Sequence, residues 1–387
     1  MELVHQILIV IIIAEVFSYL VISMNADLRE RLARRGISIY PFMYLIDLGK
    51  MPKFKVKPKT SNILSLLLLV FGIANFVFLL YIFYQTLLPY VIMLVKGLVV
   101  GAQVSSPFIP IVPGITVSIN QFIYIILALS IGVALHEIFH AFAAYLNGWR
   151  VESWGIGLFL IFPLAYVRPS EEDYKKSSIK SKAIVLSAGV LANTILFLIA
   201  MALMPVAFAS IQTAVVIISV EKNVTAPAFK AGIPYPSIIV SINNSKVSSI
   251  DDLRNTLMKY KNSSVTYVMG IVKAEIVGDV VKPTSNISYY IVHKPKGRWR
   301  LGIVITELPL ANTSPLTIAL ARFLYWFYIV NISLAIINAA PLYITDGGKL
   351  ISEVLSRVKL NVLNHLVQGL TAAFVAIFLL IGLMRFI

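Results

Sequence analysis

The chain has 387 residues, 58% of them hydrophobic, and its mean hydropathy is +0.85. Soluble domains are roughly half apolar, and the excess here lies in runs long enough to cross a bilayer, so an ordinary soluble protein is excluded. The net charge of +15 would suit nucleic acid, but Lys and Arg flank the apolar runs, as in membrane proteins, and we expect no nucleic-acid partner. The absence of cysteine excludes disulfides and thiolate metal sites and leaves His and carboxylate as the expected ligands.

Residues 1–212 form a predicted N-terminal membrane block. Four apolar runs in it are long enough to cross a bilayer as helices, at residues 3–24, 63–84, 121–146 and 183–204. The first run lacks a basic leader and a small-residue cleavage site, so we interpret it as a retained anchor. The loop at 25–60 is rich in Lys and Arg, which predicts that it is cytoplasmic and that the N-terminus lies outside. The proline-rich run at 85–120 predicts an interfacial helix and then an irregular segment.

The third run contains Leu135-His136-Glu137-Ile138-Phe139-His140. On a helix, positions i and i+4 share a face, so His136 and His140 can bind one metal ion, with a third ligand from elsewhere. Glu137 lies beside the first histidine and can take a proton from a metal-bound water. This is the H-E-x-x-H arrangement of zinc peptidases. A core role for the histidines is the alternative, but ionisable groups at membrane depth are costly and normally functional.

Residues 148–169 are rich in β-formers, Gly and Pro, which predicts a short hairpin rather than a helix. The hairpin follows His140 closely, so we expect it near the metal, where an edge strand could pair with an unwound substrate. Gly155 and Gly157 would permit close backbone approach, and Pro163 suits an edge because it has no N–H to donate. The alternative is a packed connector.

Residues 213–308 are predicted to form a small α+β domain. Short β-rich runs alternate there with Asn and Ser turns, and residues 250–260 have the pattern of a helix. Five N-x-S/T sequons in or just after this segment predict that it is extracytoplasmic: Asn223, Asn243, Asn262, Asn286 and Asn312.

The C-terminal membrane block, residues 309–387, contains two more apolar runs, at 315–337 and 362–387. Between them lies Asn338-Ala339-Ala340-Pro341-Leu342-Tyr343-Ile344-Thr345-Asp346-Gly347-Gly348. We expect Asp346 at the membrane depth of His140, which makes it a candidate third ligand. Two His and one carboxylate leave an open position, as a catalytic zinc requires. Asp346 could instead cap a helix starting at Gly347, and the local sequence leaves both interpretations open.

Three motifs together resemble the site-2 protease family of intramembrane zinc metalloproteases. They are H-E-x-x-H in one apolar run, Ala-Gly-x-x-x-Asn in the next, and N-x-x-P-x-x-x-x-D-G after the fifth. The insert resembles a PDZ domain through residues 226–233, 238–243 and 250–253, although Pro236-Ser237 replaces the Gly-Asp usual in bacterial PDZ domains.

The resemblance implies a role for each motif residue. It implies that Zn²⁺ is bound by three ligands, which are His136, His140 and Asp346. Glu137 would be the catalytic base. Asn193 and Asn338 would be polar groups that line the site, and Asn338 is a candidate to position substrate or stabilise the oxyanion.

The apolar runs predict a polytopic α-helical membrane protein with about six transmembrane helices and the inserted PDZ-like domain. The resemblance implies an endopeptidase that cuts transmembrane proteins in or near their spans, in regulated intramembrane proteolysis. We expect a multi-pass protein of the cell membrane with its active site toward the cytoplasm. An inactive relative that only binds membrane proteins is the alternative, against which the intact Glu137 argues. The lack of an internal repeat argues against a transporter.

Overall fold

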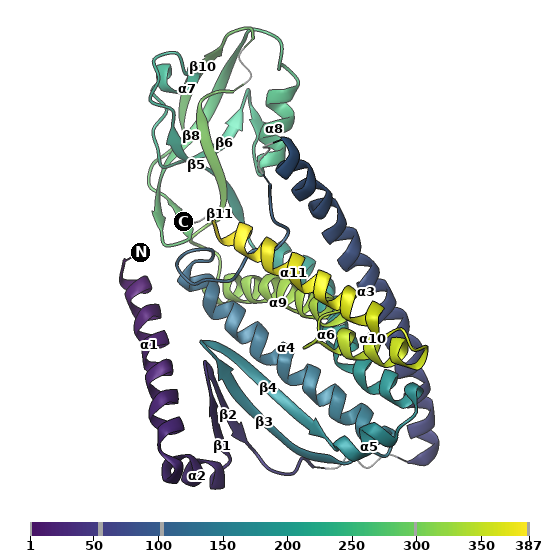
Figure 1. Ribbon diagram of the computed structural model, residues 1–387. Coiled ribbons are helices and arrows are strands. Elements are labelled where there is room, and N and C mark those ends of the chain that lie inside the picture. The colour runs from purple at the N-terminus through teal and green to yellow at the C-terminus, as the bar shows by residue number, and fades with distance from the viewer. Residues whose placement is uncertain (1, 53–56, 101–103, 298–299, 385–387) are drawn as a thin grey trace. The chain divides into compact units, whose positions relative to one another are not determined.

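Two compact units make up the protein, for which the computed structural model describes residues 2–52, 57–100, 104–297 and 300–384 (Figure 1). The first unit combines Met1–Ala202 with Arg322–Ile387. The second is Leu203–Ala321. In the chain, the second unit is therefore an insertion into the first.

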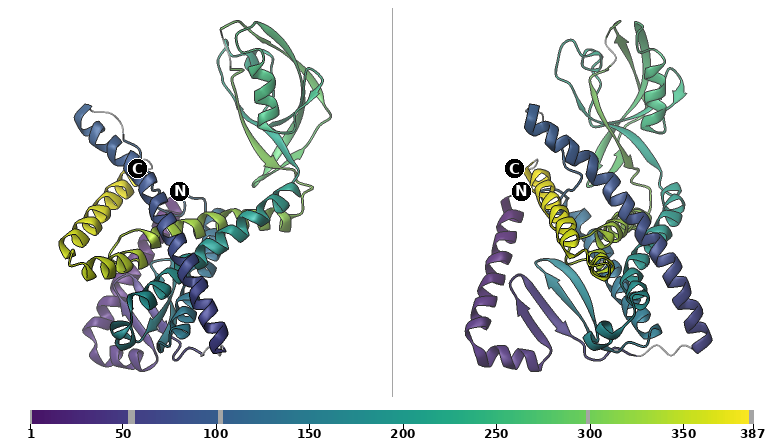
Figure 2. Two further views of the ribbon diagram at one scale, coloured as in Figure 1. Left: turned by 90° about the vertical axis from the view of Figure 1, so that its right-hand side faces the viewer. Right: turned by 45° about the vertical axis from the view of Figure 1, so that its right-hand side comes forward.

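Apolar helices are the main elements of the first unit. Five helices in the described residues are long and apolar enough to cross a membrane: α3 (Pro58–Val100), α4 (Ile119–Leu146), α6 (Ile179–Ala209), α9 (Pro315–Ala339) and α11 (Asn361–Met384). The number becomes six if α1 (Glu2–Met24) and the short α2 (Ala26–Arg34), bent by 101° from each other, count as one broken span (Figure 2). The predicted polytopic helical class is confirmed at this level.

Helix α3 continues where the sequence predicted a break. We expected a span ending near Tyr84 and a separate interfacial helix, but α3 runs through Pro89 to Val100. A proline removes one backbone hydrogen bond from a helix, whereas ending the helix would free several groups at once. In an apolar segment the continuous helix is therefore the cheaper solution.

A four-stranded antiparallel sheet completes the first unit. Its strands lie in the order β1 (Ile37–Tyr40), β2 (Met43–Asp47), β3 (Val151–Phe159) and β4 (Phe162–Pro169). The β3–β4 pair confirms the predicted hairpin. Strands β1 and β2 lie in the basic segment that we had predicted to be a loop. They make β3 an interior strand and leave β4 at the end of the sheet.

The core around α4 consists largely of small and aliphatic side chains. Its buried members include Ala141, Ala143, Ala144, Val151, Ile184, Val185 and Ala188. Alanines allow helices to approach closely in apolar surroundings, which suits the packing of α4 on α6. Strand β4 lies along α4 (Figure 1). The short α5 (Glu171–Lys176) follows β4, and α10 (Asp346–Arg357) packs against α11.

The second unit contains a seven-stranded sheet. Its strands are β5 (Thr213–Val220), β6 (Ser237–Ile242), β7 (Ser245–Lys246), β8 (Val265–Val277), β9 (Val280–Pro283), β10 (Ser288–Lys294) and β11 (Ile303–Pro309). The main order is β10-β8-β6-β5-β11, with β7 beside β6 and β9 beside β8. Helices α7 (Pro227–Lys230) and α8 (Ile250–Met258) accompany the sheet. Buried Val215, Ile217, Ile239, Tyr267 and Met269 form the centre of its core. The structure thus confirms the prediction that a helical membrane protein carries an inserted domain with a β-sheet.

Candidate functional site

The two histidines of the H-E-x-x-H motif meet on one face of α4. This helix begins at a capping box between Ser118 and Gln121 and continues without interruption beyond His140. His136 and His140 are buried, at 7% and 8% exposure, and their ring centroids lie 4.7 Å apart. One helical turn therefore brings both imidazoles to the same place.

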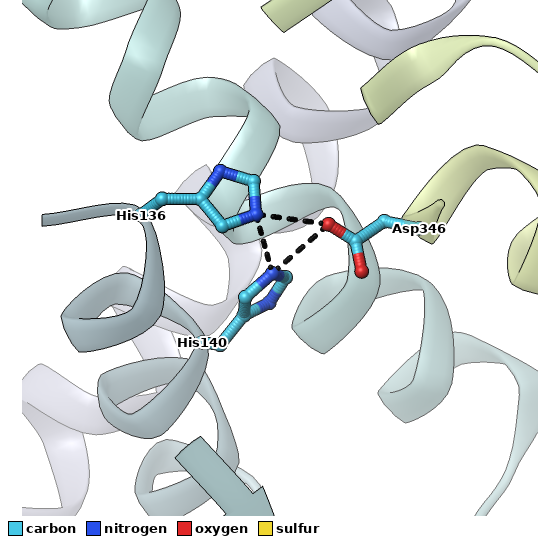
Figure 3. A group of neighbouring side chains, drawn as sticks. All are labelled: His136, His140 and Asp346. Atoms are coloured by element: carbon cyan, nitrogen blue, oxygen red, sulfur yellow. Dashed lines mark hydrogen bonds and ion pairs between the residues drawn. The ribbon is translucent and has the colours of Figure 1, made fainter. Parts of the chain in front are cut away.

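Asp346 reaches this place from α10. It is the first residue of that helix, and the N-cap is Thr345, whose Oγ1 accepts a hydrogen bond from Gly348 N–H at 3.1 Å. The interpretation of Asp346 as the cap is therefore wrong. Asp346 Oδ2 lies 3.1 Å from His136 Nε2 and 3.0 Å from His140 Nε2, and the two Nε2 atoms are 3.0 Å apart (Figure 3).

The outer nitrogens of both imidazoles have partners of their own. His140 Nδ1 lies 2.7 Å from the main-chain oxygen of Val185, and His136 Nδ1 lies 2.7 Å from Asn193 Oδ1. A carbonyl oxygen only accepts, so Nδ1 of His140 carries a hydrogen, and in the neutral ring its Nε2 presents a lone pair. Hydrogen bonds of this kind orient metal-binding imidazoles in proteins.

A metal ion fits this arrangement. The three donor atoms lie within 4.8 Å of one another. Zinc ligands at about 2.0–2.2 Å in tetrahedral geometry stand roughly 3.4 Å apart, close to the spacing found here. Three lone-pair atoms this close together need a positive charge between them, either a metal ion or a proton on an imidazole nitrogen. Gly189 of α6 faces them, and a Cβ at this position would overlap both Nε2 atoms. The glycine keeps the space in front of the imidazoles open.

Glu137 lies beside this group and is held by the sheet. Its Oε2 accepts a hydrogen bond from Val167 N–H of β4 at 2.9 Å. Glu137, His140 and Asp346 line one cavity of about 760 Å³, together with side chains from β4 and α6. The carboxylate of Glu137 and two of the three potential metal ligands, His140 and Asp346, thus face a common space that is large enough for a peptide segment.

Helix α10 is anchored on two sides, which fixes Asp346. Gln368 of α11 is fully buried and donates to Gly348 O at 3.3 Å and to Ser352 Oγ at 2.8 Å. Lys182 of α6 forms an ion pair with Glu353 at 2.8 Å. The position of Asp346 therefore depends on helices from both parts of the first unit.

The two predicted asparagines lie in different surroundings. Asn193 is fully buried behind His136, and it also donates to Asn331 Oδ1 at 3.4 Å. Asn338 is half-buried near the end of α9 and is not among the residues that line the cavity. Sequence reasoning missed Asn331 and the role of Gly189. A lone Asn inside an apolar run is itself a signal, because polar groups at membrane depth are rare.

Comparison with known proteins agrees with this geometry. The model of peptidase family M50 matches residues 124–382, more than half of the chain. The chain is also similar to an uncharacterized protein of Methanocaldococcus jannaschii, with 28% identity over 222 residues. That match covers 57% of this chain and 54% of the relative, so the chain spans about half the length of the curated relative it matches. From the extent of the family match, the chain belongs to peptidase family M50, the site-2 protease family of membrane metallopeptidases.

Proposed function

We propose that the chain is a zinc endopeptidase that hydrolyses peptide bonds in or near transmembrane segments of other membrane proteins. One observation carries the proposal: His136, His140 and Asp346 form a buried group of potential metal ligands in a unit of membrane-spanning helices, with Glu137 beside it. The resemblance to site-2 proteases suggests that the cut follows an earlier one elsewhere in the substrate and releases a cytoplasmic regulator.

His136, His140 and Asp346 would hold the ion, because two imidazoles and a carboxylate suit zinc. Zinc held there would supply a water with its pKa lowered to about 7 and a Lewis acid for the carbonyl to be cut. Glu137 takes a proton from the attacking water and returns it to the departing amine. The N–H of Val167 holds the Glu137 carboxylate at the cavity wall. Asn338 remains our candidate for positioning the substrate or stabilising the oxyanion.

We further propose that the substrate unwinds and pairs with the outer edge of β4, the edge that does not bond to β3. A helical substrate keeps its carbonyls in internal hydrogen bonds, and unwinding leaves groups that each cost several kcal/mol if unpaired in an apolar setting. The hydrogen bond from Val167 N–H to Glu137 shows that this N–H points away from β3. Backbone groups alternate in direction along a strand, so those of Ala165 and the carbonyl of Pro163 point to the same side. A substrate strand paired along this edge would therefore lie next to Glu137, the proposed base.

Gly155 and Gly157 serve a different purpose from the one we predicted. They lie on β3, which is paired with β2 as well as β4. A Cβ at Gly155 would overlap Ile46 O, and one at Gly157 would overlap Tyr44 O. These glycines let β2 approach β3, and the strand available to a substrate is β4, where Pro163 lies.

The second unit is proposed to be an extracytoplasmic PDZ-like domain that selects substrates. It has a largely apolar groove of about 750 Å³ between α8 and β11, lined by Leu253, Leu257, Ile303 and Ile305 among others. Strand β11 ends the sheet, so an extended peptide could be added along it. The basic segment 25–60 and the sequons support an outside position for this unit. Cysteines introduced singly at Lys50 and Asn262 test the orientation, because the native chain has none. Labelling of position 50 from outside sealed cells would overturn it.

Metal analysis and a cleavage assay test the proposed function. Purified protein should contain about one zinc per chain, and His136→Ala or Asp346→Ala should lose both metal and activity. Glu137→Gln should keep the metal and lose cleavage of a model transmembrane peptide, because Glu137 is not a ligand. If Asp346→Ala holds zinc as tightly as wild type, the ligand assignment is wrong. A zinc-loaded wild type that binds membrane proteins without cutting them would favour the inactive alternative.

A further inference from the structure

Three fully or nearly buried polar side chains form a row across three helices of the first unit. His136 of α4 is 2.7 Å from Asn193 of α6 through Nδ1 and Oδ1. Asn193 Nδ2 donates to Asn331 Oδ1 of α9 at 3.4 Å. Asn331 Nδ2 donates to the main-chain oxygen of Phe327, one turn earlier in its own helix, at 2.8 Å. The row starts at a backbone carbonyl and ends at an imidazole.

The first bond of the row sets the direction of the others. The oxygen of Phe327 can only accept, so the NH₂ group of Asn331 must face it and Oδ1 must face Asn193. Asn193 then presents its NH₂ group to Asn331 and its oxygen to His136. His136 must therefore carry a hydrogen on Nδ1, and in the neutral ring Nε2 then presents a lone pair. The opposite order would bring two oxygens together at Phe327.

The tautomer of His140 does not depend on a side-chain amide, because its Nδ1 faces the main-chain oxygen of Val185 directly. The side chain of Asn193 is different, since an amide can turn over and then donate to Nδ1 of His136. In that arrangement Nε2 of His136 would carry the hydrogen and could not bind a metal. Gly132 of α4 leaves space for the side chain of Asn331, because a Cβ at this position would lie 2.8 Å from Asn331 Oδ1.

We infer that Asn331 is a positioning residue that fixes the tautomer of His136 through Asn193, so that Nε2 is free to bind metal. The inference rests on the proposed function for the identity of the ion, but the tautomer itself is a property of the metal-free protein. It assigns a role to an asparagine outside the three sequence motifs.

The tautomer is measured by nitrogen NMR of metal-free full-length protein labelled with [¹⁵N]histidine, at a pH where the imidazoles are neutral. Every sample carries Asp346→Ala, because without a metal the carboxylate oxygen 3.1 Å from His136 Nε2 would itself draw a hydrogen to that nitrogen. The His136 signals are identified by adding His136→Gln. The Asp346→Ala parent should carry hydrogen on Nδ1 of both His136 and His140. Adding Asn331→Leu should shift His136 toward the Nε2–H form and leave His140 unchanged. A parent protein whose His136 carries hydrogen on Nε2 would overturn the inference, whether or not the Asn331 variant folds.

Zinc affinity in a double-mutant cycle gives the second readout. Asn331→Leu should weaken zinc binding by about 10- to 100-fold, as loss of such outer partners typically does. In an Asn193→Asp background both side-chain oxygens accept, so the orientation of residue 193 no longer matters and Asn331→Leu should have almost no effect. An equal loss in both backgrounds would mean that Asn331 acts only by packing. If the Asp346→Ala parent shows the expected tautomer but the wild type binds no zinc, the proposed function fails and the tautomer assignment stands.

Discussion

Gly189 decides whether two imidazoles and a carboxylate can share an ion. A Cβ at this position would overlap both Nε2 atoms, and α6 is packed too tightly to move away. We therefore expect Gly189→Ala to weaken zinc binding by at least about 100-fold, equivalent to ~2.8 kcal/mol. Isothermal titration of the metal-free protein measures this directly.

Gly369 of α11 provides the matched control. It is also a helical glycine, but among the described residues nothing lies within 4 Å of the place that a Cβ would take there. Gly369→Ala should leave zinc affinity unchanged and raise helix stability slightly, by up to ~1 kcal/mol. Equal zinc binding by Gly189→Ala and wild type would show that the ion does not occupy the space between the imidazoles.

The same residues show how far local sequence reaches. His136 and His140 are predictable because an i,i+4 pair needs only a helix. Asp346 comes from a segment far along the chain, so its local sequence left a cap and a ligand equally open. In the structure Thr345 takes the cap, which leaves Asp346 as a candidate ligand. Asn331 could not be assigned at all, because its role depends on tertiary contacts with Asn193 and with its own helix carbonyl.

At the scale of elements, the sheet shows a similar division. Composition was enough to predict the β3–β4 hairpin, because turn residues and β-formers lie close together in the chain. The order of strands was not predictable, because β2 pairs with β3 across more than a hundred residues of sequence. That pairing leaves β4 at the end of the sheet, and it moves the proposed substrate edge from Gly155 and Gly157 on β3 to β4.

This change leads to a sharper test of strand addition. Ala165 lies on β4, and by the alternation that starts at Val167 its N–H points away from β3. Ala165→Pro removes that donor without removing a bond to β3. Because an unpaired group costs about 1–3 kcal/mol, we expect turnover of a transmembrane substrate to fall roughly 5- to 100-fold with zinc content unchanged.

Ala165→Val is the control, since it keeps the N–H and favours the strand. Its turnover should stay near that of wild type. Substrate helices loosened by Gly or Pro near the cut should also be cleaved faster than all-Leu helices. Normal turnover by Ala165→Pro would count against pairing at this edge, and so would equal rates on loosened and rigid helices.

For the whole molecule, the decisive feature is that the chain enters the second unit's sheet and leaves it at neighbouring positions. Thr213 at the start of β5 is the direct antiparallel partner of Pro309 at the end of β11. A short Gly-Ser linker can therefore replace residues 214–308 without stretching the chain, since paired residues lie about 5 Å apart. The proposed ligands and the proposed base, which are His136, His140, Asp346 and Glu137, belong to the first unit, Met1–Ala202 with Arg322–Ile387.

We expect this excision to leave zinc stoichiometry and affinity as in the full chain, because each proposed ligand is oriented by helices of the first unit. Selectivity is what should change. If the second unit acts as an outer gate, the full chain should cut a substrate with a trimmed ectodomain much faster than one with a bulky folded ectodomain. The excised protein should cut both at similar rates. Loss of zinc on excision would refute the independence of the site, whereas unchanged selectivity would refute the gate and leave the peptidase proposal intact.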